Sequence, residues 1–221
     1  MANYTWSHSL DDACSGSLGV EGCFITQPYN PGADYSSSAY DLPNVFNVAF
    51  DYELPIGQGQ MLSLPNHVLN SLLSGWQLSG VLSLRSGTPL SVSQGLVSDL
   101  ANIGGGAAQA PNRVCNPVIS NPTNAAWFNT SCFVLPAQYT YGNAGRNILR
   151  GPAGPGSYNF SFMKSFRLYE QLNLQYRADF FNTFNLAYPS NPDTTFGSPT
   201  FGRILGGSGG RTIQMALRLT F

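Results

Sequence analysis

The sequence predicts an all-β protein: an incomplete, antiparallel transmembrane β-barrel of about six long strands with long extracellular loops. Three observations support this prediction. Apolar and polar side chains alternate along six separate segments, and helical periodicity is almost absent. The segments span roughly 9 to 12 residues, which suits a tilted strand crossing a bilayer, whereas sandwich strands usually have about 5 or 6 residues. The connections between them are either short or very long, as in bacterial outer-membrane barrels.

The composition excludes several other classes. The chain has 221 residues, a formal net charge of -1 and 10% charged residues, against roughly 25% in ordinary soluble domains. A protein without a basic excess is poorly suited to neutralise phosphates, so no nucleic-acid partner is expected. Aromatic residues make up 13% of the chain, which argues against disorder. The sequence contains no apolar run long enough for a transmembrane helix.

The first three predicted strands cover residues 3–10, 46–54 and 76–85. Each has one apolar face, because successive side chains of a strand point to opposite sides. His8 interrupts the apolar face of the first strand. The apolar positions of the three strands are Tyr4, Trp6, Leu10, Phe46, Val48, Phe50, Tyr52, Leu54, Trp76, Leu78, Leu82 and Leu84.

The last three predicted strands cover residues 158–168, 171–180 and 212–221. Lys164 interrupts the apolar face of the first of these. Aromatic residues near strand ends, such as Trp6, Trp76 and Tyr158, fit the girdles at the two membrane interfaces. The apolar positions of the three strands are Tyr158, Phe160, Phe162, Phe166, Leu168, Leu172, Leu174, Tyr176, Ala178, Phe180, Ile213, Met215, Leu217, Leu219 and Phe221.

The connections predict which end of each strand is extracellular. Residues 11–43, 87–156 and 183–210 form three long connections, which fall outside if the C-terminus is periplasmic. Residues 169–170 form a tight inner turn. The remaining inner connection, residues 55–75, is long for a periplasmic turn, and its apolar spacing predicts a short amphipathic helix before Gly75.

All four cysteines lie in the two largest extracellular connections, Cys14 and Cys23 in the first and Cys115 and Cys132 in the second. Three pairings are possible, and the local one, Cys14 with Cys23 and Cys115 with Cys132, needs the least rearrangement. Disulfides imply an oxidising compartment. A zinc site is the alternative, but the spacings match no usual ligand pattern.

Several short motifs are spread over nearly the whole chain. These are YTWSHSLDD at 4–12, YELP at 52–55, GWQLSG at 75–80, WFNT at 127–130, GNAGRN at 142–147, FFNTFN at 180–185, and the terminal Phe221. In these motifs and in their order, the sequence resembles the C-terminal part of Oar-like TonB-dependent transporters of the bacterial outer membrane.

This resemblance implies a nutrient-uptake protein located in the bacterial outer membrane, whose barrel of about 22 strands is closed by an N-terminal plug. Residues 1–221 are expected to be the last six strands, with the signal peptide and plug absent, and not independently active. The expected partners are outer-membrane lipid, the barrel-assembly machinery through Phe221, and the TonB complex only through the missing N-terminal part.

Five charged residues are the candidate binding residues because the alternation places them on the polar, lumen-facing side: Arg85, Arg167, Arg177, Asp179 and Arg218. They either line the solute path or pair with one another or a plug to keep the interior polar. The aromatic residues Trp127, Phe128, Tyr139 and Tyr141 of the second long connection either stack on a ligand or pack the loop on itself.

The sequence does not predict an enzyme, a cofactor or a metal. Residues 206–210 match the G-x-S-x-G pattern around Ser208, but a glycine-rich loop leading into a strand is the wrong context for a nucleophile. Only His8 and His67 are available as a base. The alternative to the barrel is a secreted, disulfide-stapled β-sandwich whose long loops bind a glycan or a peptide.

Overall fold

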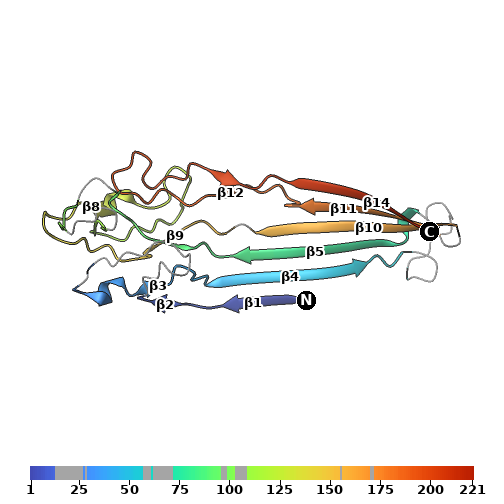
Figure 1. The fold of residues 1–221 in the computed structure, drawn as a ribbon, viewed down its shortest axis with the longest axis horizontal. Helices are drawn as coiled ribbons and strands as arrows, with labels where there is room; N and C mark the ends of the chain where they lie inside the picture. The colour runs from blue at the N-terminus through green and yellow to red at the C-terminus, as the bar shows by residue number, and fades with distance from the viewer. Residues whose placement is uncertain are drawn as a thin grey trace.

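Six long strands form one antiparallel sheet in the order β1-β4-β5-β10-β11-β14 (Figure 1). The computed structural model describes residues 1–12, 27, 29–56, 61, 72–95, 99–102, 109–154, 156–169 and 172–221. In this part of the chain the sheet is open, with β1 and β14 at its edges. Each long strand pairs with the next one along the chain, which is the up-and-down order of outer-membrane barrels. The strands are β1 (Ala2–Trp6), β4 (Asn44–Glu53), β5 (Trp76–Arg85), β10 (Ser157–Tyr169), β11 (Leu172–Phe181) and β14 (Thr212–Thr220).

All six predicted strands are confirmed, and the first is shorter than expected. β1 ends at Trp6, and extended backbone resumes at β2 (Leu10–Asp11), which pairs with β3 (Ser36–Ser37). His8 lies between the two, and its Nδ1 is 3.3 Å from Asp41 Oδ2. The prediction that His8 sits on the apolar face of the sheet is therefore wrong, because this side chain lies beyond the end of β1 beside a buried carboxylate.

The strand register aligns the apolar side chains of all strands on one face. Phe160 of β10 lies opposite both Gly80 of β5 and Phe180 of β11, and Phe180 lies opposite Ile213 of β14. A slip of one residue would move a whole set of apolar side chains to the polar side. The alternation read from the sequence therefore explains the observed register.

Gly80 leaves a gap in this apolar face that two aromatic rings fill. The rings of Phe50 and Phe160, on the strands either side of β5, approach each other with centroids 5.9 Å apart. A Cβ at Gly80 would lie 2.4 Å from the Phe160 ring and 2.7 Å from the Phe50 ring. The absence of a side chain at this position therefore lets the two rings cover the strand.

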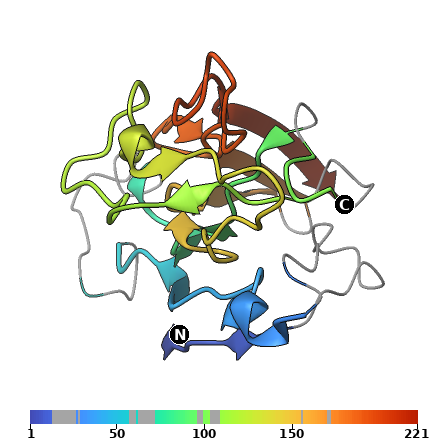
Figure 2. The same cartoon turned by 90° about the vertical axis from the view of Figure 1, so that its left-hand side faces the viewer.

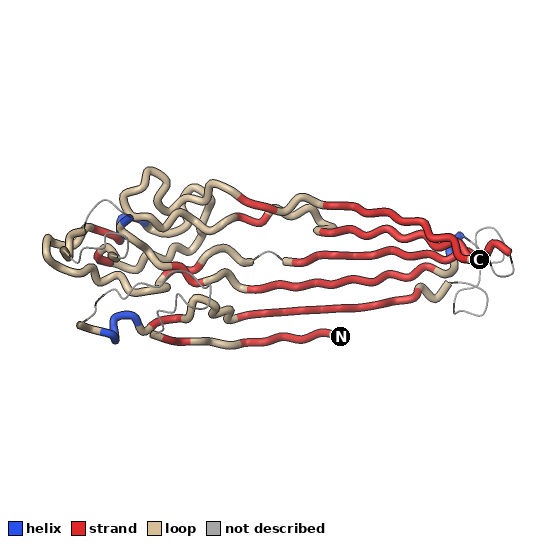
Figure 3. The backbone as a smooth tube through the Cα atoms, viewed as in Figure 1, coloured by secondary structure: helices blue, strands red, loops and turns tan. Residues whose placement is uncertain are grey.

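The three long connections gather at one end of the sheet, and the C-terminus lies at the other (Figures 1 and 2). Figure 3 shows that this end consists mainly of loop, with short strands and single helical turns. We call it the extracellular cap. Its elements are β2, η2 (Pro31–Asp34), β3, β6 (Pro89–Leu90), β7 (Asn112–Arg113), η4 (Thr130–Cys132), β8 (Phe133–Val134), β9 (Leu149–Arg150), β12 (Tyr188–Pro189) and β13 (Gly207–Ser208).

The main hydrophobic core lies in the cap and not on the sheet. Phe128, Phe133 and Phe201 contact one another edge to face, with centroids 5.1 to 5.9 Å apart. Phe128 is buried, and Trp127 packs against the same cluster. Of the two roles open to these aromatic residues, packing the loop on itself is the one observed for Trp127 and Phe128. The buried apolar residues of the core are Leu90, Val92, Ala110, Phe128, Cys132, Phe133, Ala144 and Leu149.

The inner connection between β4 and β5 is described only in part. Leu72 and Leu73 are helical, and the chain turns at Gly75, whose φ is +71°, before β5 begins. The rest of the helix predicted in this connection lies outside the described residues.

Candidate functional site

The apolar face of the sheet is widely exposed. Trp6 on β1 is 72% exposed, and Met215 and Leu217 on β14 are 66% and 71% exposed. A sandwich would bury these side chains between two sheets. Exposure of a large apolar surface is instead typical of a barrel wall that contacts lipid. The β-sandwich alternative is not favoured.

Two tryptophans mark the ends of this apolar band. Trp76 begins β5, and Trp6 lies opposite Asn44, which in turn bonds to Ser86 just past the end of β5. Ten residues of strand rise about 33 Å, or about 25 Å along the membrane normal at a tilt of about 40°. That height matches the apolar band of outer-membrane barrels, about 25 Å.

The opposite face carries hydrogen-bonded polar side chains. Gln77 Nε2 donates to both carboxylate oxygens of Asp51 at 2.8 Å. Ser83 Oγ donates to Asn47 Oδ1 at 2.6 Å. Each contact joins β4 to β5 at or near directly opposed positions, so the polar face is organised by cross-strand pairs.

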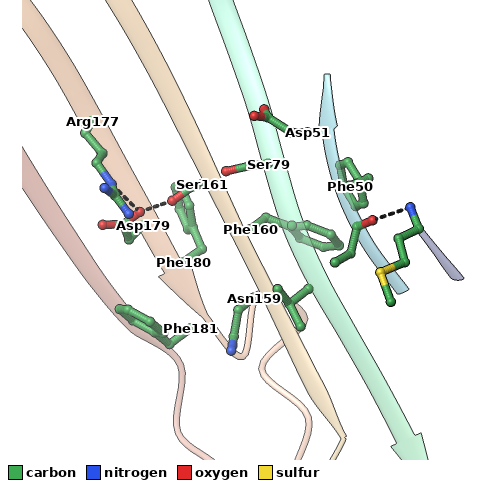
Figure 4. Close-up of a pocket in the computed structure, with 14 residues that line it drawn as sticks. Phe50, Asp51, Ser79, Asn159, Phe160, Ser161, Arg177, Asp179, Phe180 and Phe181 are labelled. Carbon is green, nitrogen blue, oxygen red and sulfur yellow. Dashed lines mark hydrogen bonds and ion pairs between the residues drawn. The ribbon is translucent and has the colours of Figure 1, made fainter. Parts of the chain in front are cut away.

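Arg177 and Asp179 form the centre of the candidate site. Arg177 Nε lies 2.9 Å from Asp179 Oδ1, and Ser161 Oγ of β10 donates to the same oxygen (Figure 4). These residues line a hollow of about 600 Å³ that also reaches Asp51 and Ser79. The arrangement offers a guanidinium, a carboxylate and hydroxyl groups on one wall, which suits contact with a polar solute.

The other candidate residues share this face but do not gather at the same place. Arg85 lies at the extracellular end, opposite Val45. Arg167 and Arg218 lie toward the opposite end, facing Asn173 and Gln175 respectively. Arg218 lines a second hollow of about 390 Å³ with Ser165, Asn173, Gln175 and Thr220. The five residues therefore extend along the face and do not form one cluster.

Arg146 joins the first extracellular connection to the second. Its Nη2 donates to the main-chain oxygen of Asp11 at 2.7 Å and forms an ion pair with the Asp11 carboxylate. Its Nε donates to the main-chain oxygen of Asp34 at 3.1 Å. The Arg146 side chain is only 9% exposed, so these bonds satisfy a charge that burial would otherwise make costly.

A second contact between the same connections is centred on Asp41. Arg150 Nη2 donates to Asp41 Oδ2 at 2.7 Å, and the Ser9 amide donates to Oδ1 at 2.8 Å. Burial raises the pKa of the Asp41 carboxyl, but hydrogen bonds from Ser9, Arg150 and His8 outweigh burial and hold the pKa below its usual range. Asp41 is therefore a buried carboxylate stabilised in its ionised form.

The remaining long connection is joined to the second by main-chain hydrogen bonds. Phe196 N donates to Ser93 O at 2.7 Å, and Trp127 N donates to Gly202 O at 2.8 Å. The second connection is also closed on itself by the predicted disulfide between Cys115 and Cys132, which is confirmed. The other predicted pair, Cys14 and Cys23, lies outside the described residues.

Sequence reasoning missed the buried charges of the cap. Asp11 and Arg146 entered the sequence analysis only as members of the YTWSHSLDD and GNAGRN motifs. Polar residues in long connections are normally solvent-exposed, and no local spacing relates Arg146 to Asp11. The available signal was that both residues fall inside the short motifs on which the resemblance rests.

Ser208 and His67 are the other residues that the sequence analysis weighed for chemistry. Ser208 lies in β13, paired with Tyr188, and His67 is outside the described residues. Within the described ranges, His, Cys, Asp and Glu side chains form no group of three that could hold a metal. No helix among the described residues is long and apolar enough to cross a bilayer.

Comparison with known proteins agrees with this geometry. A family model described as an outer membrane beta barrel domain matches residues 1–214. No curated protein and no solved structure matches the chain significantly. The match covers nearly all of the sequence, and the sheet has the apolar outer face and long extracellular loops that such a domain requires. The chain belongs to the outer-membrane β-barrel family and is located in the bacterial outer membrane.

Proposed function

We propose that this chain forms part of the wall and the extracellular vestibule of a TonB-dependent transporter, which takes up a nutrient without catalysing a reaction. One observation carries the proposal: a continuous apolar face is backed by a polar face that holds Arg177, Asp179 and Arg218. Such a wall separates lipid from a polar path along its other side.

The motifs that resemble Oar-like transporters support the finer part of this proposal. Asp11 and Arg146 belong to two of these motifs and bond to each other. Trp127, in a third, donates from Nε1 to the main-chain oxygen of Arg150 at 2.8 Å. In a fourth, Asn182 directly follows β11 with φ +53°, and its side-chain Nδ2 donates to the main-chain oxygens of Leu186 and Gly209. Chains that share these motifs are expected to share these contacts, and hence the cap.

Energy-dependent uptake is the property to measure. Cells that express the complete transporter of which residues 1–221 form a part should take up its nutrient only when TonB is present and the inner membrane is energised. The nutrient is sought with a panel of compounds too large for porins. Loss of uptake after deletion of TonB or addition of a protonophore is the expected result. Uptake that continues unchanged without TonB would contradict the proposal that transport depends on TonB. The barrel would then be a passive channel.

The variants Arg177→Met and Asp179→Asn test whether the polar face carries the solute. The Arg177 side chain of this ion pair is 55% exposed to solvent. Loss of the pair should therefore lower the free energy of unfolding by less than about 1 kcal/mol. Uptake should nevertheless fall, because the solute would lose charged contacts. Arg113→Gln, at an exposed position on the cap, is the matched control. Uptake that is equal in all variants would show that the path lies elsewhere.

We also propose that Phe221 serves the barrel-assembly machinery. Phe221 is 94% exposed at the end of β14, so its ring contributes little to packing and is accessible to a partner. Phe221→Ala should lower the amount of protein in the outer membrane while leaving the stability of the assembled protein unchanged. Leu219→Ala, two residues earlier on the same face, is the control. Equal membrane levels for Phe221→Ala and the parent would contradict this role.

A further inference from the structure

Four polar side chains form a row across the polar face of the sheet, one from each of four neighbouring strands. Asp51 of β4 lies opposite Ser79 of β5. Ser79 also lies opposite Ser161 of β10, and Ser161 lies opposite Asp179 of β11. Neighbouring strands are about 4.8 Å apart, so the row extends over about 14 Å. All four residues line the hollow of about 600 Å³ that also contains Arg177 (Figure 4).

The next row toward the extracellular cap is largely apolar, although it lies on the same face. Ala49 lies opposite Val81, and Val81 lies opposite Asn159. Phe181 is on the same face as Asp179, two positions further along β11. Val81 is 48% exposed and Phe181 is 44% exposed, so no other part of the described chain buries them. Both rows line the same hollow, which therefore has one polar and one apolar side.

Hydrogen bonds hold the carboxylates of the polar row in place. Asp179 Oδ1 accepts from Arg177 Nε at 2.9 Å and from Ser161 Oγ. Both oxygens of Asp51 accept from Gln77 Nε2 at 2.8 Å. The Arg177 side chain is 55% exposed, and a guanidinium has further N–H groups besides Nε. The polar row therefore presents acceptors and donors whose directions are set before a solute arrives.

The charges of the hollow disfavour an anionic solute. Among the side chains that line it, the carboxylates of Asp51 and Asp179 outnumber the single guanidinium of Arg177. A carboxylate or phosphate group of a solute would therefore meet an excess of like charge. A metal ion is also a poor fit, because the two carboxylates are three strands apart and cannot both bind it. A neutral solute with many hydroxyl groups matches the hollow better.

A sugar has both of the properties that the two rows require. Its hydroxyl groups surround the ring and donate well to carboxylates, because hydrogen bonds to charged groups are stronger than those between neutral groups. The faces of the ring carry C–H groups, which pack on aromatic and aliphatic side chains. One edge of such a molecule is therefore complementary to the polar row, and one face is complementary to the apolar row.

We propose that the hollow binds a neutral oligosaccharide, with hydroxyl groups on the row from Asp51 to Asp179 and C–H groups on Phe181 and Val81. The row of about 14 Å is longer than one sugar ring, so the ligand is a chain of several sugar units. This inference rests on the proposed function, since the hollow lies on the face along which that function places the solute path, and it names the class of solute.

Binding is measured by isothermal titration calorimetry on the complete transporter of which residues 1–221 form a part. The protein is purified in a dimethylamine oxide detergent, which has no sugar headgroup to compete for the site. The probes are maltoheptaose, cellohexaose and xylohexaose, and the charged comparison probes are tetraglutamate and tetralysine. At least one of the three oligosaccharides should bind, and tetraglutamate should not.

Replacement of Phe181 tests whether this hollow is the site. Phe181→Ala should weaken binding of the oligosaccharide about tenfold, because the ring that stacks on the sugar is lost. Phe181→Trp should keep the affinity of the parent. Ile213→Ala is the matched control and should also keep it, since Ile213 is likewise 44% exposed but lies on the apolar face, opposite Phe180. Ser161→Ala removes one hydroxyl group from the polar row and should weaken binding as well. Strand circular dichroism checks that each variant is folded.

Three results would overturn the proposal: binding of none of the three oligosaccharides, binding of tetralysine alone, or equal affinity of the parent and folded Phe181→Ala for the oligosaccharide. Binding in micelles needs neither TonB nor an energised membrane. A sugar that binds but is not taken up by cells would contradict the proposed transport and leave this inference standing. TonB-dependent uptake of another nutrient, without any sugar binding, would contradict this inference alone.

Discussion

Arg146 and Asp11 form a partly buried ion pair across 135 positions of sequence, and the same guanidinium group donates to the main-chain oxygen of Asp11 at 2.7 Å. Because Nε also bonds to the main-chain oxygen of Asp34, one side chain holds two separate parts of the first extracellular connection. The cap is thus kept together by a polar contact as well as by its aromatic core.

Arg146→Met should release the first connection from the second. The substitution leaves the Asp11 carboxylate and two carbonyl groups without this donor, at a cost of about 1 to 3 kcal/mol, because the Asp11 side chain is 20% exposed and water reaches it. Hydrogen exchange measures the effect, since the Ser38 amide donates to Ser9 O at the base of the first connection. This amide should exchange faster, and amides within β4 should not.

Arg113→Met is the control for Arg146→Met, because Arg113 is exposed on the same cap. The hydrogen bond that Arg113 donates to Asn143 Oδ1 comes from its main-chain N–H, so the substitution leaves it in place. It should leave the exchange of the Ser38 amide unchanged. Equal exchange in the two variants would show that Arg146 does not hold the first connection.

The sheet was predictable because the information that specifies a strand is local. The segment 76–85 alternates strictly enough that its predicted bounds coincide with those of β5. One apolar face also determines the register of each neighbour. The cap was not predictable in this way, because the contact between Arg146 and Asp11 leaves no periodic trace in the sequence.

At the candidate site, too, the positions along the strands were predictable and the contacts with loops were not. Alternation placed Arg177 and Asp179 on the polar face, which β11 confirms, and their ion pair lies within one strand. The interruption at Lys164 was also visible in the pattern. Its partners were not, since Lys164 Nζ donates to the main-chain oxygen of Leu72, which is 92 positions away along the chain and belongs to a connection. The sequence pattern therefore predicts on which face of the sheet a side chain lies. The residues to which that side chain bonds depend on how the loops fold.

Asp41 should make the cap sensitive to acid. The pKa of its carboxyl in the folded state lies below the ordinary value of 3.8, so the ionised form stabilises the fold. This stabilisation is complete above about pH 4 and is lost as the pH falls from there through the folded-state pKa. The Ser9 amide donates to Asp41, and its protection, which is its exchange rate relative to that of an unstructured peptide at the same pH, should fall below that pH.

The variant Asp41→Asn separates this carboxylate from others that titrate in the same range. At pH 7 it should already show the faster exchange of the Ser9 amide, because a neutral amide holds Arg150 less well. Lowering the pH should then produce a smaller further change than in the parent. An identical pH response in the two proteins would mean that another carboxylate controls the cap.

Removing the disulfide should destabilise the extracellular cap through its second connection. Cys115 and Cys132 are separated by 17 positions, and closing a loop of that size stabilises by about 3 kcal/mol. In Cys115→Ala/Cys132→Ala, unfolding of the cap by urea should occur at a lower concentration. Fluorescence of Trp127, with the other two tryptophans replaced by Phe, reports this transition. An unchanged midpoint would show that the cap core is sufficient without the bond.

Gly80→Ala should destabilise the sheet although the added group is one methyl. The new Cβ would meet the ring of Phe160 at 2.4 Å and that of Phe50 at 2.7 Å, and forcing such rings aside costs about 1 to 3 kcal/mol. The temperature at which the protein in micelles loses its strand circular dichroism should fall. Ser79→Ala, on the polar face of the same strand, should have little effect. Adding Phe50→Leu to Gly80→Ala should restore part of the lost unfolding temperature, because a smaller side chain leaves room for the methyl group. A double variant no more stable than Gly80→Ala would show that ring crowding is not the cause.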